Sequence, residues 1–137
     1  MPPLYFVDTW FVIAQLNEAD PDHRFALHTA RQLSDASFVT HDGVLTELLT
    51  FFSSYGEFWR RETAAFARKV IANRRYTTLP LSRELFLEAL EMYERRLDKE
   101  YSLVDCMSMR IMLRLGIKHV LTNDHHFKQE GFILVNE

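Results

Sequence analysis

Residues 4–11 read LYFVDTWF, and this stretch decides the fold class. Four apolar or aromatic residues, 4–7, have the length and composition of a buried strand, and Asp8 stands at its carboxyl end. The next residues, TWFVIAQLN, predict a short apolar helix that begins without a linker. A carboxylate at the end of a buried run is costly unless something pairs with it, so Asp8 is the first candidate for a functional residue.

The same alternation of short apolar runs and longer amphipathic patterns continues along the chain. It predicts further strands over 36–41, 76–82, 118–124 and 132–136, and helices over 9–17, 22–35, 43–52, 57–74, 82–98 and 102–116. Such alternation is typical of a three-layer α/β domain, with a mainly parallel central sheet of four or five strands flanked by helices. There is no internal repeat and no Pro/Gly/Ser-rich linker, so residues 1–137 are expected to form a single domain.

Composition excludes several classes of protein. With 47% hydrophobic and 26% charged residues, the chain has the balance of a soluble globular protein. No apolar run approaches the roughly 20 residues that span a bilayer, and MPPLYF is unlike a signal peptide. The single cysteine, Cys106, excludes an internal disulfide framework and favours a cytoplasmic location. The net charge of −3 argues against coating nucleic acid through bulk charge, so any contact with RNA must use local basic clusters.

Three more acids stand in settings like that of Asp8. Glu47 lies in GVLTELLTFF among small and apolar neighbours, and Asp105 lies in SLVDCMSM, in the first turn of an apolar helix. Asp124 ends the predicted strand KHVLTND. In open α/β sheets, ligands bind beyond the carboxyl ends of the strands, so Asp8 and Asp124 face one crevice if their strands are neighbours.

Each acid also has an ordinary interpretation when it is taken alone. Asp8 and Asp124 could cap helices, Asp105 could form a capping box with Ser102, and Glu47 could be partly exposed. The joint pattern favours a shared site, because several carboxylates in one crevice repel one another unless a cation neutralises them. Mg²⁺ or Mn²⁺ suits such oxygen ligands, and the chemistry best matched is hydrolysis of a phosphodiester.

Four motifs together resemble the PIN domain, and within it the VapC-like toxins of toxin–antitoxin pairs: FVDTWF, VLTELL, SLVDCMSM and LTNDHHF. The resemblance implies a Mg²⁺- or Mn²⁺-dependent endoribonuclease that acts on RNA. It also implies a homodimer that a small antitoxin protein inhibits. By this resemblance the metal ligands and catalytic residues are Asp8, Glu47, Asp105 and Asp124, with supporting hydroxyl groups on Thr9 and Thr122.

One position departs from the family pattern. Some relatives carry another acid two residues after the last Asp, and here that residue is His126. A solvent-facing loop histidine is the expectation for His126, with a metal ligand as the alternative.

The sequence fits other functions less well than it fits a ribonuclease. A PIN-like module that binds RNA or protein without cutting is the main alternative, although the presence of all four acids argues against it. A receiver-like signalling domain fits poorly, because Asp8 has no adjacent acid and Glu47 lies on a helix rather than at a strand end. A haloacid-dehalogenase-type phosphatase needs a second Asp where Trp10 stands.

Two further features carry weaker predictions. Arg61 and Arg68 lie two turns apart on one predicted helix, where they either grip an RNA backbone or belong to a solvated face. Cys106 has no His at a recognisable spacing and is expected to be a small buried residue rather than a nucleophile.

Overall fold

The computed structural model describes residues 2–135, in which five strands alternate with seven helices. The strands are β1 (Leu4–Val7), β2 (Ser37–His41), β3 (Tyr76–Leu79), β4 (His119–Leu121) and β5 (Ile133–Leu134). The helices are α1 (Thr9–Leu16), α2 (His23–Gln32), α3 (Asp42–Phe51), α4 (Glu57–Ala72), α5 (Arg83–Arg95), α6 (Leu103–Leu115) and α7 (His126–Gln129). Every predicted strand and helix is present. The last strand is shorter than expected, residue 136 of that prediction lies outside the described residues, and the one-turn α7 was not predicted.

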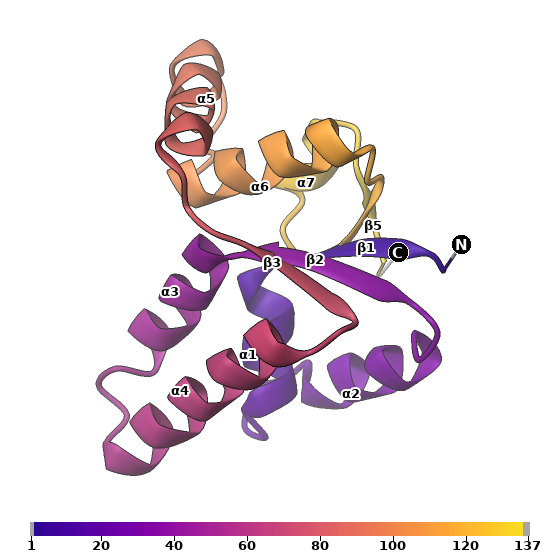
Figure 1. Ribbon diagram of the computed structural model, residues 1–137, viewed down its shortest axis with the longest axis vertical. Coiled ribbons are helices and arrows are strands. Elements are labelled where there is room, and N and C mark those ends of the chain that lie inside the picture. Colours follow the sequence, from indigo (N-terminus) through magenta and orange to yellow (C-terminus); the bar gives the residue numbers. More distant parts are fainter. Residues whose placement is uncertain (1, 136–137) are drawn as a thin grey trace.

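All four strand pairings are parallel, in the order β3-β2-β1-β4-β5. Helices α1 to α4 cover one face of this sheet and α5 to α7 the other, which confirms the predicted three-layer α/β fold (Figure 1). Neighbouring residues of β1 point to opposite faces, as strand geometry requires. Phe6 belongs to the same core cluster as Met109 of α6, whereas Val7 belongs to the cluster of Leu48 of α3, and all four side chains are fully buried. No helix within residues 2–135 is long and apolar enough to cross a membrane.

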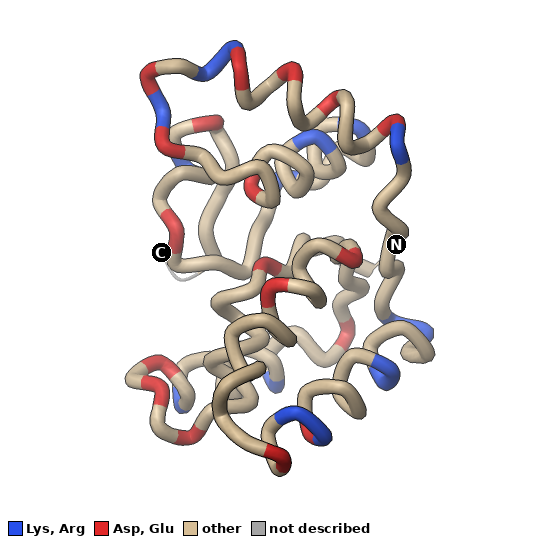
Figure 2. Tube along the Cα trace, turned by 90° about the vertical axis from the view of Figure 1, so that its left-hand side faces the viewer, with Lys and Arg blue, Asp and Glu red and all other residues tan. Residues whose placement is uncertain are grey.

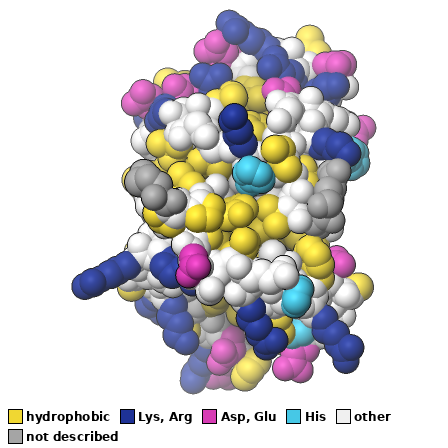
Figure 3. Space-filling view, turned by 90° about the vertical axis from the view of Figure 1, so that its right-hand side faces the viewer, with side chains coloured by type: hydrophobic (Ala, Val, Ile, Leu, Met, Phe, Trp, Pro, Cys, Tyr) yellow, Lys and Arg dark blue, Asp and Glu magenta, His cyan; other side chains and the backbone are white. Residues whose placement is uncertain are grey.

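The strand order reverses beside β1. The chain passes from β1 to β2 and β3 on one side, then returns to place β4 and β5 on the other side. Asp8 follows β1 and Asp124 follows β4, so the two strands are neighbours, as the shared crevice requires. Figure 2 views the molecule from the end at which the strands finish. The opposite end, where the strands begin, carries a band of hydrophobic side chains across its middle (Figure 3).

A buried histidine fixes two of the helices at the carboxyl ends of the strands. His41 ends β2 and is fully buried. Its Nδ1 accepts a hydrogen bond from the Gly43 N–H at 3.0 Å, so Nε2 carries the proton and donates to Ser108 Oγ at 2.8 Å. Ser108 in turn donates to the Val104 carbonyl at 3.0 Å. The ring therefore links the start of α3, which carries Glu47, to α6, which carries Asp105.

Replacement of His41 by alanine should destabilise the protein by about 3 kcal/mol, because it leaves a cavity and unsatisfied polar groups at Gly43 and Ser108. The change in the midpoint of urea denaturation measures this loss. Ser108→Ala removes one partner with little volume and should cost about 1 kcal/mol. A His41→Ala protein as stable as the wild type would show that the ring does not join the two helices.

Candidate functional site

The four predicted acids come from four different elements and line one open cleft of about 800 Å³. Asp8 lies between β1 and α1, Glu47 lies in α3, Asp105 in the first turn of α6 and Asp124 in the loop after β4. No lysine or arginine is among the described residues that line this cleft. Basic positions lie mostly on the outer helices in the view onto this end of the molecule (Figure 2). The cleft therefore brings together the four predicted carboxylates and a fifth, Asp20, which the sequence analysis did not single out, without a lysine or arginine among them.

Asp8 is the most buried of the four acids, with 7% of its surface exposed. It stands at the N-terminus of α1, but its side chain makes no capping hydrogen bond. Instead, Asp8 Oδ2 accepts a hydrogen bond from Thr122 Oγ1 at 2.7 Å. Burial raises the pKa of Asp8 to about 7, against the effect of this hydrogen bond, and the charges of Asp105 and Glu47 raise it further.

Glu47 and Asp105 are held by hydrogen bonds within the cleft wall. Thr9 Oγ1 donates to Glu47 Oε1 at 2.6 Å. Asp105 forms the predicted capping box with Ser102, whose side chain and backbone N–H both bond to it at 3.0 Å. Burial is the main cause of a raised pKa in both acids, and the charge of Asp105 also raises the pKa of Glu47. The carboxylates of Glu47 and Asp105 are thus already oriented by their neighbours.

Thr122 connects the two acids at the strand ends. Its hydroxyl group donates to Asp8 and accepts the Asp124 N–H at 3.1 Å. Asp124 Oδ1 accepts the backbone N–H of His126 at 2.9 Å. The capping interpretation of Asp124 therefore holds in part, because its carboxylate supports the turn into α7.

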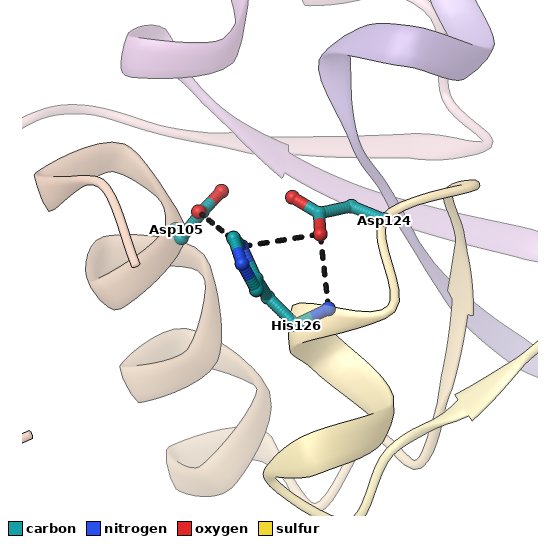
Figure 4. Close-up of side chains that lie close together, drawn as sticks. All are labelled: Asp105, Asp124 and His126. Atoms are coloured by element: carbon teal, nitrogen blue, oxygen red, sulfur yellow. Dashed lines mark hydrogen bonds and ion pairs between the residues drawn. The ribbon is translucent and has the colours of Figure 1, made fainter. Parts of the chain in front are cut away.

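His126 is mostly buried, contrary to the expectation of a solvent-facing residue. Its side chain is 21% exposed, and Nδ1 lies 3.2 Å from Asp124 Oδ1 and 3.7 Å from Asp105 Oδ2 (Figure 4). These three side chains offer ligand atoms within 4.8 Å of one another. Asp8 and Glu47 line the same cleft but stand outside this close group. The expectation of a solvent-facing loop residue was wrong because the short helix α7 turns the ring toward the acids.

The donor set fits a divalent cation. Carboxylate oxygens predominate, as Mg²⁺ and Mn²⁺ prefer. The raised pKa of Asp8, caused mainly by burial, shows that its charge is poorly compensated by the protein alone. The His126 Nδ1 atom is also out of contact with solvent and makes no hydrogen bond. A protonated His126 would pair with Asp105 and Asp124, whereas no cationic group lowers the pKa of Asp8. The buried charge of Asp8 therefore lacks a positive partner among the described residues.

The cleft also has an apolar wall. Trp10 and Ile13 of α1, Phe51 of α3 and Leu81 before α5 line it beside the acids. The same surface therefore offers both charge and hydrophobic contact to a ligand.

Two weaker predictions have different outcomes. Cys106 is fully buried, and burial raises the pKa of its thiol to about 11, so the prediction of an inert buried residue is confirmed. Arg61 is exposed and pairs with Glu57 at 2.6 Å. This pairing favours the solvated-face interpretation of that part of α4.

Comparison with known proteins defines the class. The family model of the PIN domain matches residues 5–132, and the chain belongs to this family. The PIN-domain membership predicted from the four motifs is thereby confirmed.

Solved structures give the resemblance to VapC toxins. The chain is similar to VapC20 of Mycobacterium tuberculosis, a sarcin–ricin loop cleaving toxin. The identity is 26%, the coverage is 95% of this chain and 96% of that one, and the TM-score is 0.81. It shares its fold with a chain in the structure of VapBC2 from Rickettsia felis bound to a DNA fragment from their promoter. That match has 15% identity, covers 96% of each chain and has a TM-score of 0.63. A search of curated protein sequences finds no match.

Proposed function

We propose that this protein is a metal-dependent endoribonuclease that hydrolyses RNA phosphodiester bonds, and that it is the toxin of a toxin–antitoxin pair. The observation that carries the proposal is the convergence of Asp8, Glu47, Asp105 and Asp124 on one cleft of a PIN domain. The similarity to VapC20 over nearly the whole chain supports RNA as the substrate class.

The chain's own residues have distinct roles in this proposal. Asp8, Glu47, Asp105 and Asp124 hold one or two divalent cations, Mg²⁺ or Mn²⁺, and orient the attacking water. Such cations supply the positive charge that stabilises the attacking and leaving oxygens of a phosphodiester. Thr9 and Thr122 keep Glu47 and Asp8 in position, since each donates a short hydrogen bond to the carboxylate.

The apolar wall of the cleft suits a protein inhibitor. A small antitoxin could place an apolar segment against Trp10, Phe51 and Leu81 and a basic side chain against the acids. Such a partner would cover the RNA-binding surface and the metal site together. Assembly as a homodimer belongs to the same proposal, by analogy with the VapC-like toxins.

Incubation of the purified protein with total cellular RNA, and separately with intact ribosomes, tests the proposal. We expect discrete RNA fragments in Mn²⁺ or Mg²⁺ and none in EDTA, because the acids cannot act without a cation. Sequencing of the fragment ends identifies the cleaved bond, and comparison of the two substrates shows whether ribosomal RNA is cut in its folded state. Intact RNA in every lane, from folded protein free of inhibitor, would favour the non-catalytic binding module.

A further inference from the structure

The position of the His126 ring is set by the fold around it. The next residue, Phe127, is fully buried and packs against Phe132, which anchors the single turn of α7. The His126 ring packs against Tyr101, with 5.4 Å between ring centroids. Tyr101 is itself buried, and its hydroxyl donates to Glu130 at 3.2 Å. These contacts leave the ring directed at the acids.

The Nδ1 atom of His126 lies in an unusual environment. It is out of contact with solvent, makes no hydrogen bond, and faces Asp124 Oδ1 at 3.2 Å and Asp105 Oδ2 at 3.7 Å. Two arrangements satisfy this atom: a proton on Nδ1, which would pair with both carboxylates, or a metal ion bound by Nδ1 and the carboxylates together. Figure 4 shows all three groups directed toward one another from α6, α7 and the loop before it.

The spacing and the chemistry suit a cation. Adjacent ligand atoms of an octahedral ion, each about 2.1 Å from the metal, lie about 3 Å apart, close to the separation of Nδ1 and the Asp124 carboxylate. Imidazole nitrogen is a poor ligand for Mg²⁺ but binds divalent transition metals, with affinity that generally rises from Mn²⁺ to Co²⁺ and Ni²⁺.

We infer that His126 Nδ1 is a metal ligand together with Asp105 and Asp124, and that this nitrogen gives the site a preference for divalent transition-metal ions over Mg²⁺. The inference deepens the proposed function, on whose metal site it rests. It assigns a selectivity role to the position at which some relatives carry an acid.

Metal binding without RNA tests the inference. Titration calorimetry should show that His126→Ala weakens Mn²⁺ binding by about 10- to 100-fold and changes Mg²⁺ binding by less than about threefold. Pulsed electron paramagnetic resonance of bound Mn²⁺ should show coupling to a ¹⁴N nucleus in the wild type and none in His126→Ala. His126→Asp should restore affinity for Mn²⁺ through an oxygen ligand without restoring the nitrogen coupling. All proteins must lack a histidine tag.

His125→Ala is the matched control, because His125 is the adjacent, exposed histidine. It should retain both Mn²⁺ affinity and the nitrogen coupling. Tight Mn²⁺ binding that shows no nitrogen coupling and is unchanged in His126→Ala would overturn the role of His126 while the proposed nuclease stands. Failure of the wild type to bind any divalent cation would overturn both.

Discussion

Asp8→Asn should lower the rate of metal-dependent RNA cleavage by a factor of about 1,000 and leave the fold intact. The substitution removes the charge of the most buried acid in the cleft but keeps its size and its ability to accept the hydrogen bond from Thr122. The rate of fragment formation in Mn²⁺, measured with enzyme in excess over RNA, reports the change. Circular dichroism and the melting temperature report the fold.

Asp35→Asn is the control for this experiment, because it makes the same chemical change at an exposed aspartate. It should cleave RNA at the wild-type rate. If Asp8→Asn cleaves as fast as Asp35→Asn, Asp8 has no part in the mechanism, and the proposed active site can include only the other acids.

Most of the fold could be predicted because its signals are local. The short apolar runs and the amphipathic patterns of the helices are repeated along the chain, and strand–helix alternation leaves few topologies open. The capping box of Ser102 and Asp105 was also visible, since it needs only a three-residue spacing. Helix α7 was missed because its four residues are too few to show a helical period.

The site could be predicted only in part, because its partners are distant in sequence. The rule that ligands bind at the carboxyl ends of strands brings Asp8 and Asp124 together once their strands are neighbours. The hydrogen bond between Thr122 and Asp8 joins residues 114 positions apart, and no local pattern predicts it. His126 was misplaced for the same reason, since its direction depends on packing against Tyr101. The role of His41 was missed too, although a histidine at the end of an apolar strand indicates a buried ring that needs hydrogen-bond partners.

Asp8→Asn should also stabilise the metal-free protein at pH 8, by an amount on the order of 4 kcal/mol. The pKa of Asp8 rises from its ordinary value of 3.8 to about 7 in the folded protein, mainly through burial. The folded state therefore holds this proton more tightly than the unfolded state. The stability that Asp8 contributes is fully present below pH 3.8 and is lost as the pH rises through 7. Asparagine carries no such charge, so the advantage of the variant should grow between pH 4 and pH 8.

The quantity to measure is the difference in the free energy of unfolding between variant and wild type. This is because His41 changes the stability of both proteins with pH in the direction opposite to Asp8. Burial lowers the pKa of His41 to about 4, so its contribution is present above pH 6.5 and is lost as the pH falls toward 4. Between pH 4 and pH 6.5 the two effects nearly cancel in the wild type. Urea denaturation of both proteins in EDTA, at several pH values, removes the His41 contribution by subtraction.

Addition of Mn²⁺ or Mg²⁺ at pH 8 completes the test. A cation in the cleft should offset the buried charge of Asp8, so the wild type should gain stability with metal, and Asp8→Asn should gain much less. The metal and the substitution thus relieve the same electrostatic cost, and their effects should not add. A free-energy difference that stays constant from pH 4 to pH 8, or metal stabilisation that is equal in the two proteins, would show that Asp8 does not ionise within a shared metal site.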